Sequence, residues 1–325
     1  MKIRKYIAIA SAAVLLAAGG SALATRAIPS EDNSDTDSIE EIAIGVVETD
    51  DAPEEAPAVP KYRFHCEKDT IEIGEMLGTL WQHRDLPIAD IAVKAAELLE
   101  GRPYLGHTLE GDVEQLVINV DQLDCVTFVE NCFALAMTVK EGRRSWREFS
   151  RNIESLRYRK GVQKGYDSRL HYTTVWITDN VYRGNITDVT PMLPGAKSLT
   201  KTLNFMTRHR DLYPALQDEE VYQRCREIEE GLRSMRIPYM TKESANQKNV
   251  IEELRDGDMI SFVSPKEGLD SSHVALLRII NGKPYMMHAS LKGKKVVFEK
   301  EPLYSYLKYY KRDAPGFRVL RLREQ

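Results

Sequence analysis

The chain is poor in cysteine. Its 325 residues contain only four, Cys66, Cys125, Cys132 and Cys225, with no C-x-x-C pair, and no H-E-x-x-H motif is present. The common zinc signatures are therefore missing, and no metal site is expected. Cys125 and Cys132 lie on one expected helix, about 10 Å apart, which is too far for a disulfide. Long-range pairs with Cys66 or Cys225 stay open, but this spacing is not that of a disulfide framework.

A basic excess is also lacking. Lys and Arg number 45 against 49 Asp and Glu, giving a net charge of −4, and the pI is about 6.1. This balance excludes a typical nucleic-acid binder. After the N-terminus no apolar run approaches the length of a membrane span.

The N-terminus has the pattern of an export signal. Lys2, Arg4 and Lys5 precede an apolar run over residues 7–18, and Ala22-Leu23-Ala24 matches the A-x-A cleavage pattern. The alternative, a membrane anchor, is disfavoured because the run is short and no cysteine follows it for lipidation. We expect a signal peptide over residues 1–24, a periplasmic or extracellular location, and no stable membrane insertion after cleavage.

Composition divides the rest of the chain. Residues 25–60 are acidic and rich in Ser, Ala and Pro, which predicts a flexible spacer that cannot bury enough apolar surface to order itself. From residue 61 the composition is globular, and residues 61–325 are expected to form one large domain.

The periodicity changes along this domain. Helical spacing of apolar residues predicts helices over 69–83, 90–100 and 219–235, and Ser145 with Glu148 forms a capping box that starts another. Residues 185–200 are expected to be irregular. Strand patterns follow at 257–263, 272–280, 284–290, 294–298 and 317–322. Helices followed by an antiparallel meander indicate an α+β fold.

The first candidate catalytic residue is Cys125. Asp124 is a plausible N-cap, and the apolar residues after it continue an amphipathic helix. Cys125 then lies in the first turn, where unpaired backbone N–H groups and the helix dipole favour a thiolate, the nucleophilic form of cysteine.

Two histidines on one predicted hairpin could supply the base. Asn281-Gly282 is the strongest short hairpin signal, and with these two residues at the centre of the turn, paired positions sum to 563. His273 and His288 are then diagonal neighbours on the same face of the sheet, with backbones roughly 7–8 Å apart. One histidine can therefore orient the other.

Three segments, 123–130 (L-D-C-V-T-F-V-E), 169–176 and 257–290, carry a family resemblance. They resemble the NlpC/P60 cysteine peptidases and, more narrowly, the DUF1460 family, described as N-acetylmuramoyl-L-alanine amidase-like. The resemblance implies a papain-like α+β core, a helix-borne cysteine packed on an antiparallel sheet, with helical insertions. It implies Cys125 as nucleophile, His273 as base and His288 as the residue that orients His273, with no cofactor.

The implied substrate is peptidoglycan fragments, or muropeptides, with 1,6-anhydro-muropeptides among the candidates. The bond would be the amide between N-acetylmuramic acid and L-Ala. Around it, Tyr104 could donate a hydroxyl, Arg169 could bind a carboxylate, and Tyr172 and Trp176 could stack on a sugar. The aromatic pair could equally belong to the core, and His171 could be either a substrate contact or a core histidine bonded to backbone.

Two other functions stay open. One is an endopeptidase of the same fold, which would cut between γ-D-Glu and the diamino acid. The other is a non-catalytic cell-wall binding module, although such a module would be free to lose one of the three catalytic positions.

Overall fold

The computed structural model describes residues 61–324, so the predicted signal peptide (1–24) and spacer (25–60) lie outside the described residues. In the described part the helices are α1 (Asp69–Trp81), α2 (Ile88–Leu98), α3 (Cys125–Lys140), α4 (Trp146–Arg157), α5 (Thr173–Tyr182), α6 (Phe205–Arg208), α7 (Glu219–Glu230), α8 (Lys248–Ile251) and α9 (Leu303–Tyr309). The strands are β1 (Tyr62–Phe64), β2 (Leu116–Ile118), β3 (Ile186–Asp188), β4 (Lys197–Lys201), β5 (Met235–Thr241), β6 (Met259–Val263), β7 (Ser271–Ile280), β8 (Lys283–Ser290), β9 (Lys295–Phe298) and β10 (Gly316–Leu322).

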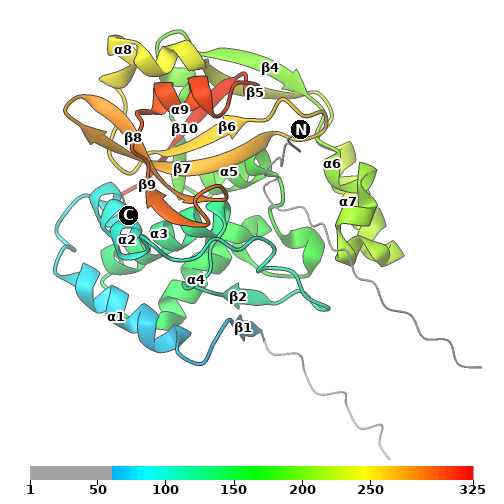
Figure 1. The fold of residues 1–325 in the computed structure, drawn as a ribbon. Coiled ribbons are helices and arrows are strands. Elements are labelled where there is room, and N and C mark those ends of the chain that lie inside the picture. Colours follow the sequence, from blue (N-terminus) through cyan, green and yellow to red (C-terminus); the bar gives the residue numbers. More distant parts are fainter. Residues whose placement is uncertain (1–60, 325) are drawn as a thin grey trace, which may run out of the picture. The chain divides into compact units, whose positions relative to one another are not determined.

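One large antiparallel sheet organises these elements (Figure 1). Its strands run in the order β4-β5-β10-β6-β7-β8-β9, and β3 also pairs with β10. The strands β6 to β9 form the predicted meander, whereas β10 pairs with the other side of β6. Most helices precede this meander in the chain, so the predicted α+β class is confirmed.

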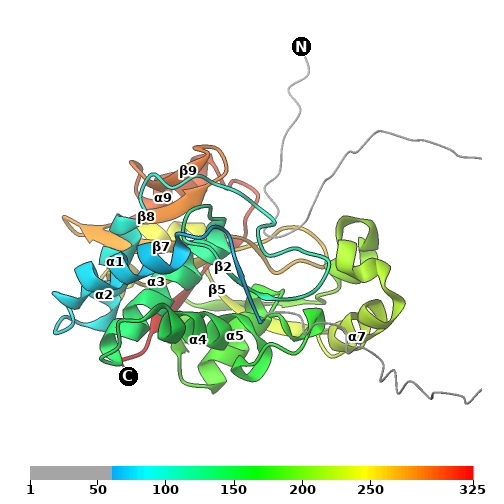
Figure 2. The same ribbon diagram turned by 90° about the horizontal axis from the view of Figure 1, so that it is seen from below.

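The sheet has an apolar core on each face. On β7, Val274 and Leu276 pack in the core that contains α3, while Ala275 and Leu277 pack in the core that contains α9. This alternation is the period of two that a strand imposes. Figure 1 accordingly shows α3 and α9 on opposite sides of the sheet, and Figure 2 looks from below onto the helical layer, in which α3 contacts α2 and α4.

The cysteine-bearing helix α3 is buried on almost all sides, and the expectation of an amphipathic helix is wrong. Its polar side chains are buried as well, and they are paired. The amide of Asn131 donates to the carbonyls of Asn119 and Thr127, and the Thr138 hydroxyl donates to the Ala134 carbonyl. A central helix packed against other helices and the sheet has no solvent face to mark with charge.

Two local predictions are wrong for reasons that lie outside the local sequence. The helix predicted over 219–235 ends at Glu230, and Met235 begins strand β5. The segment 185–200, expected to be irregular, contains β3 and most of β4. In both places a strand forms because a distant partner is available: β4 pairs with β5, and β3 pairs with β10. Tertiary pairing overrides a weak local preference here.

The start of α4 also differs from the prediction in its bonding. Ser145 is the N-cap residue, but its hydroxyl donates to the Glu148 carboxylate and not to a backbone N–H. The predicted helix start is right, and the reciprocal capping box is not formed.

Candidate active site

Cys125 is the first residue of α3, and Asp124 fixes the start of that helix. The Asp124 carboxylate accepts hydrogen bonds from the backbone N–H groups of Val126 (3.0 Å) and Thr127 (2.8 Å). The Thr127 hydroxyl in turn accepts the N–H of Asp124 at 2.9 Å, which completes a capping box. The sulfur is therefore held at a rigid position where the dipole of a sixteen-residue helix is positive.

The two histidines meet on the hairpin formed by β7 and β8. Asn281 and Gly282 both have positive φ values, 50° and 70°, as a two-residue hairpin turn requires. The register pairs Leu276 with Met287, so paired positions sum to 563 as predicted. The Nε2 of His273 lies 2.6 Å from the Nδ1 of His288, with the rings nearly perpendicular.

A carboxylate that the sequence analysis missed completes this pair. Glu299 follows β9, and its Oε2 lies 3.3 Å from the Nε2 of His288. A carboxylate only accepts hydrogen bonds, so the Nε2 of His288 carries a proton and its Nδ1 is an acceptor. His273 must then donate from Nε2, which leaves its Nδ1 as a free acceptor. The relay from Glu299 thus defines which nitrogen of His273 can take a proton.

The helix that begins with Cys125, α3, contacts both strands of the histidine hairpin, β7 and β8. The Tyr306 ring packs edge-on against His288, with centroids 5.6 Å apart, and burial, then the charges of Glu299 and Cys125, raise the pKa of Tyr306. Burial raises the pKa of Cys125 and the charge of Lys311 weakly opposes this, whereas burial lowers the pKa of His273 and Lys311 adds to that shift. The sulfur also receives a backbone hydrogen bond from Val274, the residue after His273.

Burial decides the charge state of the resting site. It raises the pKa of the Cys125 thiol to about 12, and the neighbouring Asp124 carboxylate raises it further, against the weaker opposing effects of Val274 and Lys311. Burial, then the neighbouring His288 and Lys311, lower the pKa of His273 well below its usual range. Both shifts favour a thiol and a neutral imidazole at neutral pH, whereas the helix start alone favours the thiolate that the sequence predicts.

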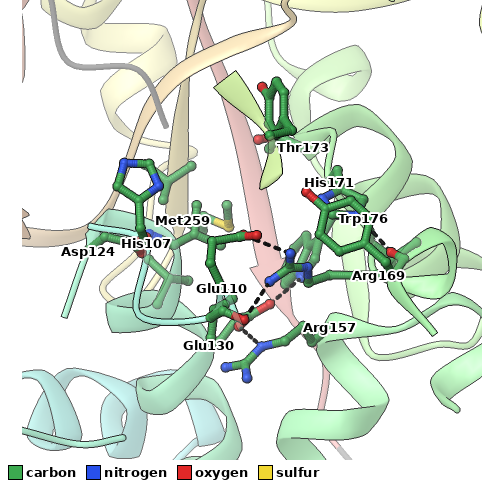
Figure 3. A pocket seen from close by; sticks show the side chains of 17 residues that line it. His107, Glu110, Asp124, Glu130, Arg157, Arg169, His171, Thr173, Trp176 and Met259 are labelled. Atoms are coloured by element: carbon green, nitrogen blue, oxygen red, sulfur yellow. Dashed lines mark hydrogen bonds and ion pairs between the residues drawn. The ribbon is translucent and has the colours of Figure 1, made fainter. Parts of the chain in front are cut away.

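A cavity opens beside the start of α3 (Figure 3). It encloses about 810 Å³ of empty space including its open mouth. Asp124 and Val126, which flank Cys125, line it together with Val274. The remaining lining comes from loop 107–110, the middle of α3 and the region 157–176, with Tyr213 and Met259: His107, Leu109, Glu110, Val129, Glu130, Arg157, Tyr166, Arg169, Leu170, His171, Thr173, Trp176, Tyr213 and Met259.

The two arginines of this cavity are already paired with carboxylates. Figure 3 shows Arg157 directed at Glu130, with Nε and Oε2 2.8 Å apart, and Arg169 directed at Glu110, also at 2.8 Å. Arg169 additionally faces Glu114 at 3.6 Å. Both arginines are therefore already neutralised by carboxylates of the protein, so neither is free to pair with a substrate carboxylate.

The other predicted wall residues separate into different places. Trp176 lines the cavity and donates from Nε1 to Glu130 at 3.2 Å. Tyr172 lines a second, smaller cavity and donates its hydroxyl to Glu229 at 2.6 Å. Tyr104 lies on the loop before α3, where burial, then the charges of Cys125 and Asp124, raise its pKa. Its phenol therefore stays protonated and can donate.

His171 has the backbone hydrogen bond expected of a core histidine, and it also lines the cavity, as a substrate contact would. Its Nε2 donates to the backbone carbonyl of Tyr166 at 2.8 Å. Burial, reinforced by the charge of Arg169, lowers its pKa to about 3, so it is neutral at physiological pH. Its role in the cavity wall is that of a neutral ring.

Two residues of the site were not found from the sequence, and one had a signal. The hairpin arithmetic applied across the next turn pairs His288 with Val297, which puts Glu299 on the same face as a diagonal neighbour. Lys311 follows α9 on the far side of the sheet, and nothing in its sequence context connects it with Cys125.

Among residues 61–324, no group of three or more His, Cys, Asp or Glu side chains is arranged to hold a metal ion. No helix of this part of the chain is long and apolar enough to cross a bilayer. All four cysteines are free thiols.

Fold and site together define an α+β protein with a buried helix-start cysteine and a linked histidine pair next to a cavity. Residues 94–314, more than half of the chain, match the AmiA-like family, described as N-acetylmuramoyl-L-alanine amidase-like. The chain belongs to this family of amidase-like hydrolases. The sequence matches none of the curated proteins.

Solved structures show the same relationship. An N-acetylmuramoyl-L-alanine amidase from Bacteroides uniformis is 32% identical and has a TM-score of 0.67, over 73% of this chain and 99% of that one. A putative xylanase from Bacteroides fragilis is 34% identical, with a TM-score of 0.66, over 70% of this chain and all of that one. A Legionella pneumophila protein of the DUF1460 family, 21% identical with a TM-score of 0.59, covers 79% of this chain and 95% of its own and shares the fold.

Proposed function

We propose that this protein is a cysteine amidase that hydrolyses the amide between N-acetylmuramic acid and L-Ala in muropeptides, including 1,6-anhydro-muropeptides. The observation that carries the proposal is the hydrogen-bonded relay Glu299–His288–His273 beside the buried Cys125, in a chain of the amidase-like family. We infer that the core is the papain-like NlpC/P60 arrangement, because the cysteine begins a helix packed on an antiparallel sheet.

The neutral resting pair sets the first chemical step. His273 takes the thiol proton at Nδ1 while the sulfur of Cys125 attacks the lactyl carbonyl carbon. The backbone N–H of Cys125 and the hydroxyl of Tyr104 are the proposed donors to the oxyanion. His273 then gives the proton to the amine of L-Ala, which leaves, and water hydrolyses the thioester in a second cycle of the same base.

The charges that line the cavity indicate which part of the substrate binds there. Its arginines are paired with carboxylates, so we propose that it holds a neutral polar group, and that Arg169 and Trp176 shape its wall without binding a carboxylate. Within residues 61–324 the hydroxyl of Tyr166 and the Nε of Arg169 are buried without a hydrogen-bond partner. These two donors are the groups that an acetamido or hydroxyl oxygen of a sugar would satisfy.

Tyr172 has a more distant role in this proposal. Its hydroxyl is engaged by Glu229 and by the N–H of Met206, and its ring faces the second cavity. We therefore propose that it supports the wall and does not stack on the sugar. Export through a signal peptide over residues 1–24 is a further proposal, which fits a substrate outside the cytoplasm.

The test is mass spectrometry of muropeptides incubated with the protein, its Cys125→Ala variant and a Cys132→Ala control, which removes a buried thiol from the same helix. Release of a free peptide beginning with L-Ala, lost only in Cys125→Ala, is the expected result. Release of a fragment that keeps the sugar, L-Ala and D-Glu would move the scissile bond to the endopeptidase position. No turnover of any muropeptide would favour the non-catalytic binding module.

A further inference from the structure

Lys311 places an ammonium group beside the catalytic cluster. It is half-buried in the segment between α9 and β10. Its Nζ lies 6.0 Å from the centroid of the Phe262 ring, and that ring is parallel to His273 at a centroid distance of 5.8 Å. An ammonium held against aromatic rings has given up part of its hydration, which costs free energy unless a negative charge is near.

In the described part of the chain, no carboxylate supplies that charge. Among residues 61–324 no acidic side chain forms an ion pair with Lys311, and the group whose charge favours its protonated form is the thiolate of Cys125. Burial lowers the pKa of Lys311, as expected for an ammonium without a carboxylate partner. Lys308, three residues earlier, is exposed and lies over the rings of Tyr304 and Tyr309.

The other groups that face the Cys125 sulfur are of a different kind. Asp124, at the start of α3, opposes a thiolate, and the phenols of Tyr104 and Tyr306 are neutral. From the hairpin, His273 is the neutral base and His288 is hydrogen-bonded to it. In this set Lys311 is the basic side chain outside the histidine pair.

We propose that Lys311 is a positioning residue of the active site, whose ammonium stabilises the negative charge that develops on the sulfur of Cys125. The inference rests on the proposed assignment of Cys125 as nucleophile. When the proton moves from the thiol to His273, a negative charge forms at the sulfur and a positive charge on the histidine pair. Lys311 stabilises the first of these charges, and Glu299, at the far end of the histidine relay, stabilises the second.

Thiol alkylation measures this effect without any substrate. The intact protein is treated with iodoacetamide between pH 7 and 9, and the modification rates of Cys125 and Cys66 are followed by peptide mass spectrometry. Cys66 is exposed and serves as the internal reference for reagent and pH. Below the pKa of the thiol, the rate follows the thiolate fraction, so removal of a nearby cation slows it at every pH.

The variants are Lys311→Met, which keeps the aliphatic stem, Lys311→Arg, which keeps the charge, and Lys308→Met as the exposed control. If removal of the cation raises the pKa of the Cys125 thiol by about one unit, roughly tenfold less thiolate is present at a given pH. Because a thiolate of higher pKa is also more nucleophilic, we expect Cys125 to react about threefold to tenfold more slowly in Lys311→Met. Cys66 should be unaffected, and Lys311→Arg and Lys308→Met should resemble the wild type.

A second readout is the acid limb of the pH profile of kcat/KM. Loss of the cation raises the pKa of His273, so the limb should move to higher pH in Lys311→Met and stay in place in Lys311→Arg.

Equal alkylation rates of Cys125 in the Met and Arg variants would overturn the proposal. If Cys132 becomes reactive, the Met variant has loosened the fold, and the comparison is made with Lys311→Gln.

The outcomes separate this inference from the proposed function. Slower alkylation of Cys125 in Lys311→Met, in a protein that turns over no muropeptide, would support the charge partnership and refute the amidase. Full muropeptide hydrolysis by Cys125→Ala would refute the nucleophile assignment and this inference with it.

Discussion

The relay from Glu299 gives the sharpest test of the mechanism. In Glu299→Gln the amide oxygen can still accept from His288, but the negative charge is lost. In Glu299→Leu both the acceptor and the charge are lost, so nothing fixes the tautomer of His288. A hydrogen bond to a charged group contributes about 1.5–3 kcal/mol. The contact is 3.3 Å long and the Glu299 side chain is 21% exposed, so we take the lower bound of about 1.5 kcal/mol, which is roughly tenfold in rate.

We therefore expect kcat/KM to fall about tenfold in Glu299→Gln and further in Glu299→Leu. The hydrogen bond from His288 lowers the pKa of Glu299, so the carboxylate is ionised throughout pH 5–8 and does not itself titrate there. Its negative charge, at the far end of the relay through His288, stabilises the positive charge that forms when His273 takes a proton, so its removal makes that protonation less favourable. The acid limb of kcat/KM should consequently move to lower pH in Glu299→Gln, by up to about one unit.

The assay is muropeptide turnover between pH 5 and 8, followed by chromatography of the released peptide. Glu301→Gln, an exposed carboxylate two residues further on, is the matched control. Wild-type values of kcat/KM at every pH in both Glu299 variants would refute the relay. A uniform loss with an unmoved acid limb would show that Glu299 acts by holding β9 in place and not through its charge.

Three further predictions concern the scaffold and the oxyanion site. Arg157→Leu leaves the buried Glu130 carboxylate unpaired and should cost about 3–5 kcal/mol of unfolding free energy at pH 8. Burial already raises the pKa of Glu130 against the opposing charge of Arg157, and loss of that charge raises it further, so denaturant titration should find a smaller loss of stability at pH 5. An equal loss at both pH values would contradict this reading. Gly316→Ala would drive a methyl group into a backbone carbonyl of β5 and should cost about 1–3 kcal/mol, whereas Gly74→Ala, in open space on α1, should be neutral or stabilising, as thermal unfolding will show. Tyr104→Phe should lower kcat by about tenfold or more with little change in KM if the hydroxyl serves the oxyanion, and an unchanged kcat would remove it from that role.

The hairpin shows how much of a site can be predicted from sequence alone. Asn281-Gly282 fixes the turn, the turn fixes the register, and the register brings His273 to His288. Each step is local and has few alternatives, so the prediction was correct at the level of individual side chains. The same reasoning continued across the next turn reaches Glu299, so that omission was not a limit of the sequence.

Other features depend on contacts between distant segments. Strands β3 and β4 form because β10 and β5 offer them partners, and their own residues carry no strand pattern. The charge state of Cys125 depends on how deeply the helix start is buried in the folded protein. A helix N-terminus favours a thiolate, but burial outweighs that effect here, and burial cannot be seen in the residues around the cysteine.

A thiol and a neutral imidazole are suited to a site that must stay closed. A resting ion pair would need two charges to be kept in a buried cluster, with Asp124 opposing the negative one. The neutral pair avoids this cost, and charge separates only when the thiol proton moves to His273. The two proposed partners of that separation lie on different elements, Lys311 after α9 and Glu299 after β9. They should therefore affect the acid limb in opposite directions, upward when Lys311 loses its charge and downward when Glu299 does, which a purely structural role of either residue would not produce.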